Sequence, residues 1–386
     1  MINFQKNDDK FPEKYINLVC LTFNIRKEWL INGQGEIFEP SCPEIDRQLI
    51  TDEMQFLKKF FDARLLAWKA AKDNFFVIGD INLDYIKDAD EFTGSASVGG
   101  NGNIIAQALS INHPVCLYGN TGADDNGREL LNLIGHNANF FPLILSAKGK
   151  ATGVCTLTYW NKEHKLIRVL DYNNKDHISN DANDYSLEDL HIAIELVNVG
   201  PGWSIFISPT IIPRYYMRKM NGLPNYDREL PDYIKSFTDI IDRQEVPLIM
   251  KIHRDFKYLP YEEFNSIILH ADLFYTELKT LENIYKFDIK KYHEKMKEEY
   301  IIQVLEKTSG KIGQQIIVCY GGGSGVDNVR RFVRKDKITI KINPIDEEIM
   351  ENYQYNDEKI KSEDRVGYID RFVINNLIKD VKKLPK

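Results

Sequence analysis

The stretch 75-FFVIGDINLDYI-86 begins with an apolar run that ends at a glycine and an aspartate. Four consecutive apolar residues with no polar residue between them are typical of a strand buried on both faces. Comparable short runs recur along the chain at 114-PVCLYG-119, 203-WSIFIS-208, 246-VPLIMKI-252, 272-DLFYT-276 and 315-QIIVCYG-321. Strands of this kind belong to parallel sheets that helices cover on both sides.

Amphipathic segments alternate with these runs. The helices we expect are 102-GNIIAQALS-110, 126-NGRELLNLI-134, 228-RELPDYIKSFTDIID-242 and 290-KKYHEKMKEEYIIQVLEKT-308. The sequence therefore predicts an α/β fold with a doubly wound, mostly parallel sheet. Residues 153–172 differ, because they alternate polar and apolar side chains around 161-NKEHK-165. We expect a β-hairpin there, lying off the main sheet like a flap.

Composition limits the class of protein. The chain has 386 residues and a net charge of -7, with charged residues at 28%. A general nucleic-acid binder would carry a basic excess, so we expect no nucleic-acid partner. The basic runs 214-RYYMRK-219 and 329-VRRFVRKDK-337 are interpreted as solvated faces.

The five cysteines are scattered, which predicts a reducing compartment without a disulfide framework. The first fifteen residues do not read as a signal peptide. No uncharged apolar stretch reaches the ~18 residues that a membrane span needs. We therefore expect a cytoplasmic protein without a membrane partner.

Residues 1–73 are predicted to form an N-terminal extension, and residues 74–386 the main domain. The extension contains 51-TDEMQFLKKFFDARLLAWKAAK-72, whose apolar residues recur at helical spacing. Because that apolar face needs cover, we expect this helix to pack on the domain that follows.

Several glycine-containing motifs follow one another in a fixed order. After the first strand and 79-GDINLDYI-86 comes 97-SVGGNGNIIAQALS-110, and then 117-LYGNTGADDNGRELL-131. Thr152 and Gly153 open the flap, and 316-IIVCYGGGSGV-326 follows a late strand. A D-x-x-G-x-x-D pattern ends the series in 364-DRVGYIDRFVINNLI-378. This order resembles the ribokinase (PfkB) family of carbohydrate and nucleoside kinases over about residues 75–378.

The resemblance implies a ribokinase-like domain with a small β lid over the substrate. The lid would be built from about residues 85–98 and 153–172. Because exposed strands can pair with a copy of themselves, the lid also leaves open a homodimer.

The resemblance also assigns the substrate contacts. Acidic, glycine and amide positions of the first motifs would meet a sugar or nucleoside, and a basic residue of the flap would reach it. These residues are Asp84, Gly99, Gly100, Asn101, Asn103 and Arg168.

The nucleotide site is implied by the C-terminal motifs. Successive backbone N–H groups of a glycine loop can wrap a phosphate, which points to Gly321, Gly322, Gly323 and Gly325. Gly367 would belong to an anion hole at a helix start, and Asp370 would be the general base. Glu277 would serve a hydrated Mg²⁺ indirectly, with ATP as the nucleotide.

The sequence departs from the family pattern where the chemistry should lie. Ile369 replaces the second glycine of the anion hole, and Thr280 stands where a carboxylate is expected. Lys251 and His253 reverse the charge of the motif after the fifth strand. Two functions therefore stay open. The chain is an ATP-dependent kinase for a sugar or nucleoside hydroxyl, or it is a catalytically impaired relative that acts as a ligand-binding or protein-interaction scaffold.

Overall fold

A computed structural model describes the following residues: 73–88, 95–134, 139–147, 150–162, 165–171, 182–222, 228–286, 297–308, 310–319, 329–336, 339–342 and 371–374. The chain divides into two units, residues 1–72 and 73–386, so all described residues belong to the second unit. The extension predicted for residues 1–73, with its packed helix, lies almost wholly outside the described residues.

The described strands of the main sheet number nine, in the order β13-β12-β11-β10-β9-β8-β1-β4-β5. Neighbours from β11 to β5 are parallel, whereas β12 and β13 run antiparallel at one edge. The bounds are β1 (Asn74–Ile78), β4 (Val115–Gly122), β5 (Phe140–Ala147), β8 (Trp203–Ile207), β9 (Leu248–Ile252), β10 (Leu273–Glu277), β11 (Gln315–Cys319), β12 (Val329–Arg334) and β13 (Ile340–Ile342).

A second sheet of four strands, which we call the lid, has the order β3-β2-β6-β7. The predicted hairpin is present, because β6 and β7 pair antiparallel. It joins the strand of the first motif, since β2 runs parallel to β6 and antiparallel to β3. The bounds are β2 (Asn82–Asp88), β3 (Ser95–Gly99), β6 (Gly153–Lys162) and β7 (Lys165–Asp171).

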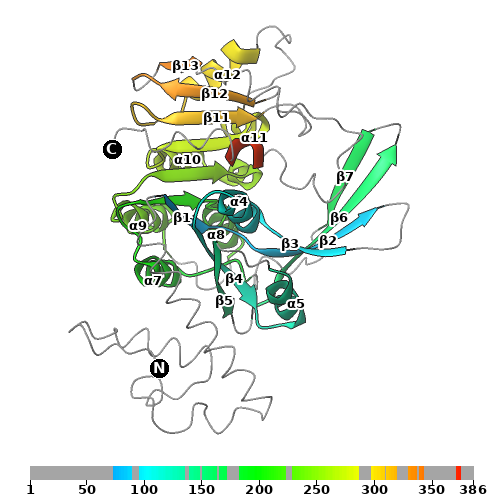
Figure 1. Cartoon of the computed structure of the whole chain (residues 1–386). Helices are drawn as coiled ribbons and strands as arrows, with labels where there is room; N and C mark the ends of the chain where they lie inside the picture. Colours follow the sequence, from blue (N-terminus) through cyan, green and yellow to red (C-terminus); the bar gives the residue numbers. More distant parts are fainter. Residues whose placement is uncertain are drawn as a thin grey trace, which may run out of the picture. The chain divides into compact units, whose positions relative to one another are not determined.

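Helices lie on both faces of the main sheet. Figure 1 shows α4 on one face and the green helices α7, α8 and α9 on the other, with the lid to one side. The predicted fold class, a mostly parallel α/β sheet with a small β lid, is therefore confirmed. The bounds are α4 (Asn101–Ser110), α5 (Asp125–Leu133), α7 (Leu187–Val197), α8 (Ile211–Met220), α9 (Leu230–Asp242), α10 (Tyr261–Ile268), α11 (Leu278–Tyr285), α12 (Lys297–Glu306) and the 3-10 helix η1 (Arg254–Tyr258).

Local sequence accounts for several helix starts. Ser186 begins α7 with a capping box, in which its hydroxyl and Asp189 satisfy each other's backbone N–H groups. Pro231 stands in the first turn of α9, where its missing N–H has no intrahelical partner to lose.

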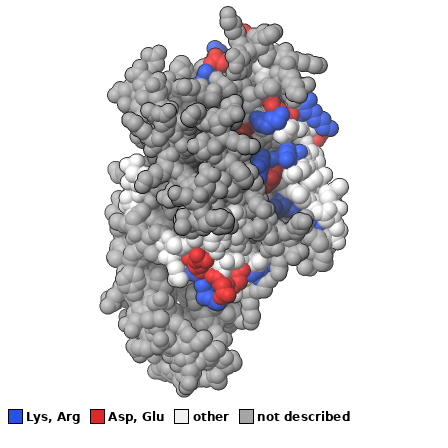
Figure 2. Space-filling view, turned by 90° about the vertical axis from the view of Figure 1, so that its right-hand side faces the viewer, with Lys and Arg blue, Asp and Glu red and all other residues white. Residues whose placement is uncertain are grey.

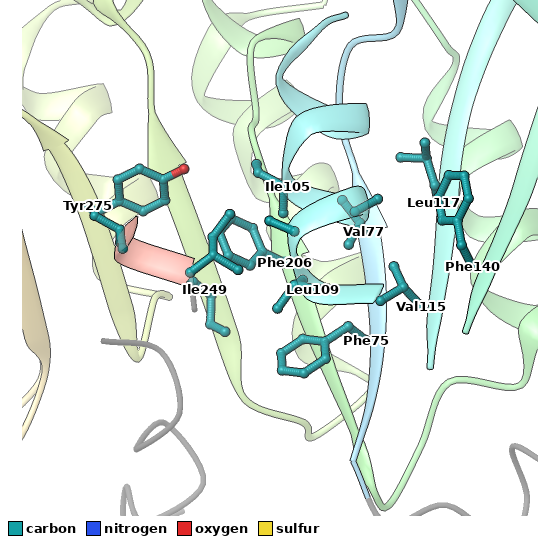
Figure 3. Packing of buried hydrophobic residues seen from close by; sticks show 14 of the residues in the cluster. Phe75, Val77, Ile105, Leu109, Val115, Leu117, Phe140, Phe206, Ile249 and Tyr275 are labelled. Atoms are coloured by element: carbon teal, nitrogen blue, oxygen red, sulfur yellow. The ribbon is translucent and has the colours of Figure 1, made fainter. Parts of the chain in front are cut away.

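A cluster of buried apolar residues lies between α4 and the strands of the main sheet. Figure 3 shows Ile105 and Leu109 of α4 facing Phe75 and Val77 of β1. These side chains are at most 3% exposed, and each contributes roughly 1.5–3 kcal/mol through burial. Phe372, Val373 and Ile374, in the helical segment 371–374 drawn red in Figure 1, belong to the same cluster.

Both basic runs interpreted as solvated faces are partly buried, so that interpretation was wrong. Residues 214–219 lie in α8, where the Arg218 side chain is 3% exposed and forms an ion pair with Asp184. Residues 329–334 form β12, and Arg334 is fully buried, donating to Thr308 Oγ1 at 2.6 Å. These arginines are tolerated inside because partners distant in the sequence satisfy them.

Three cysteines fall within the described residues, and all are free thiols. Cys116 and Cys155 are buried, and Cys319 is half-buried. Burial raises the pKa of the Cys116 thiol well above its ordinary value. In the part of the chain that the structure describes, no helix is long and apolar enough to span a membrane.

The start of α4 packs on the end of β1 through two glycines. A Cβ atom at Gly102 would lie 2.7 Å from the carbonyl carbon and oxygen of Gly79. We predict that Gly102→Ala lowers the free energy of unfolding by about 1–3 kcal/mol, because backbone atoms must move apart. Gly200→Ala is the control, since its nearest atom would be 4.0 Å away. Denaturant unfolding of both variants tests this, and equal losses would contradict the account.

Candidate functional site

The strand order of the main sheet indicates where a ligand would bind, at the carboxyl ends of the strands. From β1 the chain proceeds to β4 and β5 in one direction, whereas β8 to β11 extend in the other. In open α/β sheets, ligands bind outside the carboxyl ends of the strands where the order reverses. That point lies between β1 and β8, so residues 79–82 and 208–210 border the candidate site.

Asp84 lies on β2 of the lid, opposite Ser97 of β3 and Cys155 of β6. The residue is 5% exposed, and its carboxylate packs directly on Gly99. A Cβ at Gly99 would lie 1.8 Å from Asp84 Oδ2. Glycine is therefore required at position 99 for the carboxylate to keep its place.

Gly100 connects β3 to α4 with a φ of 85°, a conformation that favours glycine. A Cβ there would lie 2.3 Å from the carbonyl oxygen of Asp80. No side chain caps the first turn of α4. Three of the predicted substrate residues, Asp84, Gly99 and Gly100, thus come together where the lid meets the start of α4.

Asn101, the first residue of α4, is half-buried. Its Oδ1 accepts a hydrogen bond from Lys251 Nζ at 2.9 Å, and this ammonium group lies 5.7 Å from the ring centroid of Tyr275. Lys251 lies near the carboxyl end of β9, so the contact joins the start of α4 to that strand. Because 150 residues separate Asn101 from Lys251 along the chain, local sequence patterns could not predict this contact.

Asn103 is fully buried in α4. Its Nδ2 donates to the carbonyl oxygen of Val98 at 2.6 Å, and its Oδ1 accepts from Gln107 at 3.3 Å. The amide therefore ties α4 to β3, and a contact between Asn103 and a substrate stays a prediction. Arg168 lies in β7, opposite Tyr159 of β6.

Sequence analysis did not predict the charged residues that lie close to the place where the lid meets the start of α4. Arg214 of α8 donates from Nη1 to Asp80 Oδ2 at 2.9 Å and from Nη2 to Asp80 Oδ1 at 2.7 Å. Thr210 Oγ1 donates to the same carboxylate at 2.8 Å. Arg214 had been assigned to a solvated face, yet its side chain is 20% exposed. The sequence 211-IIPRYYMRKM-220 contained one indication that Arg214 is partly buried, because this basic residue stands between apolar residues at helical spacing.

The G-x-D-x-x-G motif forms a joint between α5 and the lid. Asp124 caps α5 by accepting from Gly127 N at 2.8 Å. Its other oxygen accepts from Thr152 N at 2.9 Å, and the Thr152 hydroxyl donates to Oδ1 at 2.5 Å. That hydroxyl also accepts from Gly122 N at 2.9 Å. The motif therefore fastens the start of β6, which makes its role structural.

Two opposing effects act on the pKa of Asp124. Burial favours the neutral carboxyl and raises the pKa, but hydrogen bonds from Thr152 and Gly127 favour the carboxylate. The hydrogen bonds prevail, and the pKa of Asp124 lies below its ordinary value.

The candidate magnesium position offers one accessible carboxylate. Glu277 ends β10 and is exposed, whereas Thr280 and Glu282 are each 1% exposed. Glu282 is engaged within the protein, by Tyr300 at 3.4 Å and Lys279 at 3.5 Å. Within the described ranges, no three His, Cys, Asp or Glu residues are grouped to hold a metal ion.

The predicted catalytic and nucleotide residues lie outside the described residues. They are Gly367, Asp370, Gly321, Gly322, Gly323 and Gly325. Of the described residues that follow Asp370, Arg371 is half-buried, Phe372 and Val373 are fully buried, and Ile374 is 2% exposed.

Figure 2 shows the face that lies on the right-hand side of Figure 1. Basic and acidic side chains are intermingled over its described part. A broad surface of one sign would attract a large partner of opposite charge, and the described part of this face is of mixed sign.

Neither a family model nor the sequence of a curated protein matches this chain. Several solved structures are similar to it. Phosphofructokinase-2 from Escherichia coli, in complex with substrates and products, is 13% identical with a TM-score of 0.50, covering 81% of this chain and 87% of its own.

Two further kinases have lower TM-scores. Adenosine kinase from Anopheles gambiae is 11% identical with a TM-score of 0.48, over 72% of this chain and 84% of its own. Ribokinase from Giardia lamblia is 15% identical with a TM-score of 0.46, over 71% and 76%. At 13% identity, the similarity to phosphofructokinase-2 shows the fold alone.

The hydrogen bonds of the Thr152 hydroxyl, which join the start of α5 to the start of β6, give a testable prediction. We predict that Thr152→Val lowers the free energy of unfolding by about 1–3 kcal/mol, because Gly122 N–H and Asp124 lose a buried partner. Thr152→Ser keeps the hydroxyl and should cost about 1 kcal/mol for the lost methyl group. Urea unfolding measures both, and a serine variant as unstable as the valine variant would refute the role of the hydroxyl.

The lowered pKa of Asp124 gives a prediction for pH dependence. A carboxyl whose pKa is lower when folded than in the unfolded chain, about 3.9, stabilises the protein above that value. The contribution is lost as pH falls through the folded pKa. We expect the stability difference between the wild type and Asp124→Asn to be constant between about pH 5 and 7 and to shrink below about pH 4. A difference that did not change over this series of urea unfolding curves would contradict the assignment.

Proposed function

We propose that this chain belongs among the ribokinase-like kinases and transfers the γ-phosphoryl group of ATP to a hydroxyl of a sugar or nucleoside. The observation that supports this most is the grouping of Asp84, Gly99 and Gly100 at the start of α4. It lies at the edge of the sheet where ligands of such folds bind. A carboxylate in this position can accept hydrogen bonds from substrate hydroxyls, and the glycines let a substrate approach the backbone.

The residues of the start of α4 suit an oxygen-rich ligand. Gly100 caps α4 without a side chain, and although Gly102 N already donates to the carbonyl oxygen of Asp80, the helix start carries a partial positive charge, to which Lys251 beside Asn101 adds. Both favour negative charge or oxygen atoms nearby. We propose Asn101 as a substrate contact that Lys251 orients.

The general base in this proposal is Asp370, with Gly367 in the anion hole. Asp370 directly precedes helical residues 371–374, of which 372–374 belong to the same core cluster as Ile105 of α4 and Tyr275 of β10. In this proposal, the buried residues that follow Asp370 would hold its carboxylate in place, and the carboxylate would accept the proton of the attacking hydroxyl.

The cofactor would be held by residues at the carboxyl ends of β10 and β11. The exposed carboxylate of Glu277 fits a hydrated Mg²⁺, which proteins commonly hold through one or two carboxylates and water. The glycines of 321–325 would surround the nucleotide phosphates. ATP with Mg²⁺, when bound, supplies the phosphoryl group and neutralises its charge.

The proposal is tested by calorimetric titration of ATP with Mg²⁺, followed by phosphotransfer assays on a panel of sugars and nucleosides. We predict binding and turnover, with Asp370→Asn lowering kcat about 10²–10⁴-fold and leaving nucleotide affinity nearly unchanged. Asp125→Asn is the control, because this carboxylate lies on the surface at the start of α5.

The outcomes separate the two functions that the sequence left open. Absence of nucleotide binding would contradict the kinase proposal. Binding of nucleotide and acceptor without turnover would favour the catalytically impaired scaffold. Turnover that survives Asp370→Asn would refute the assignment of the base.

A further inference from the structure

Among the described elements, the chain passes between the main sheet with its helices and the lid four times. The first crossing, 79–81, leads from β1 to β2, and the second, 99–101, leads from β3 to α4. The third, 148–152, leads into β6, and the fourth, 172–186, leads from β7 to α7. The position of the lid, and of Asp84 within it, depends on how these crossings are fixed.

Arg214 holds the first crossing. Its guanidinium binds both oxygens of Asp80, at 2.9 and 2.7 Å, and their side chains are only 20% and 14% exposed. Two parallel charge-assisted hydrogen bonds fix direction as well as distance. Thr210, which directly precedes α8, adds a third hydrogen bond to the same carboxylate.

The same side chain holds the fourth crossing. Arg214 Nη2 donates to the carbonyl oxygen of Asn183 at 3.2 Å, and Arg214 Nε lies 3.2 Å from Asp184 Oδ1. Asp184, 8% exposed, also pairs with Arg218. Two arginines and two aspartates therefore neutralise one another, which makes their burial tolerable.

The two crossings are also tied to each other and to α4. Ile81 N donates to Asn183 Oδ1 at 2.9 Å, and Asn183 Nδ2 donates to Asn82 Oδ1 at 2.9 Å. The carbonyl oxygen of Asp80 accepts from Gly102 N at 2.9 Å. A shift of Asp80 would therefore be transmitted to Asn82 on one side and to the first turn of α4 on the other.

Asn82 and Asp84 are two positions apart on β2, so they lie on the same face of the lid. The distance between Asp84 and the start of α4 is thus fixed through Asp80. We propose that Arg214 is the positioning residue that holds the lid on the main sheet and sets Asp84 against α4. Its consequence for catalysis rests on the proposed function, whereas its effect on the lid does not.

An arginine is needed because the planar fork meets four separate groups: the carboxylates of Asp80 and Asp184, the carbonyl oxygen of Asn183 and the Thr210 hydroxyl. A lysine has one ammonium group and cannot bind both oxygens of Asp80 in parallel. Arg214→Lys therefore keeps the charge and removes the geometry. Arg218→Lys is a matched control, since it makes the same substitution one turn along α8, where the ion pair is with Asp184.

The first readout is amide hydrogen exchange of the full chain, which requires no activity. In Arg214→Lys we expect exchange in β2, β3 and β6 to rise about ten- to a hundredfold relative to β9 and β10. In Arg218→Lys the ratio between lid and main sheet should change less than about threefold. Thr210→Val, which removes one hydrogen bond to Asp80, should shift the lid in the same direction by a smaller factor.

The second readout is kinetic. With an acceptor identified, Arg214→Lys should raise the KM for the acceptor about tenfold, while the KM for ATP changes little. A residue that only stabilised the fold would lower the yield of active protein and leave the KM for the acceptor unchanged.

Two results would overturn the proposal. One is equal exchange of the lid in Arg214→Lys and Arg218→Lys, and the other is a uniform rise across both sheets. If the chain transfers no phosphoryl group, the exchange experiment still decides whether Arg214 positions the lid, so the two failures are distinguishable.

Discussion

The paired hydrogen bonds between Asp80 and Arg214 are the interaction on which the arrangement of the sheet and the lid depends. They fix the chain where it leaves β1, at the point where the strand order reverses. The backbone on either side is then set by close contacts at glycines, because side chains at Gly99, Gly100 or Gly102 would collide with their neighbours. Asp124 and Thr152 fasten the third crossing separately.

Much of the fold could be predicted from the sequence. The run 75–78 was recognisable as a buried strand, because it is apolar throughout, and β1 lies inside the sheet, between β8 and β4. The hairpin 153–172 was recognisable from its alternation. Residues 101–110 formed the expected helix, because apolar residues recur at helical spacing after two glycines.

Other features could not be predicted, because they depend on partners distant in the sequence. Local pattern alone suggested that the arginines of α8 were solvated, but Asp80 and Asp184 bind them from elsewhere in the chain. Asn103 was expected at a substrate, yet Val98 engages its amide. Strands β5, β12 and β13 and helices α7, α8, α10 and α11 were not predicted, although the sequence contains the apolar run of β5 and the helical spacing of apolar residues in α10 and α11.

We infer that these hydrogen bonds keep the junction between sheet and lid rigid before any ligand binds. Amide hydrogen exchange of the unliganded wild-type protein tests it most directly, at Ile81 N and Gly102 N. These groups donate to Asn183 Oδ1 and to the carbonyl oxygen of Asp80. If the junction is rigid, the amide hydrogens of Ile81 and Gly102 exchange as slowly as those of β1. Exchange at the rate of exposed loops, such as the turn at Gly222, would contradict it.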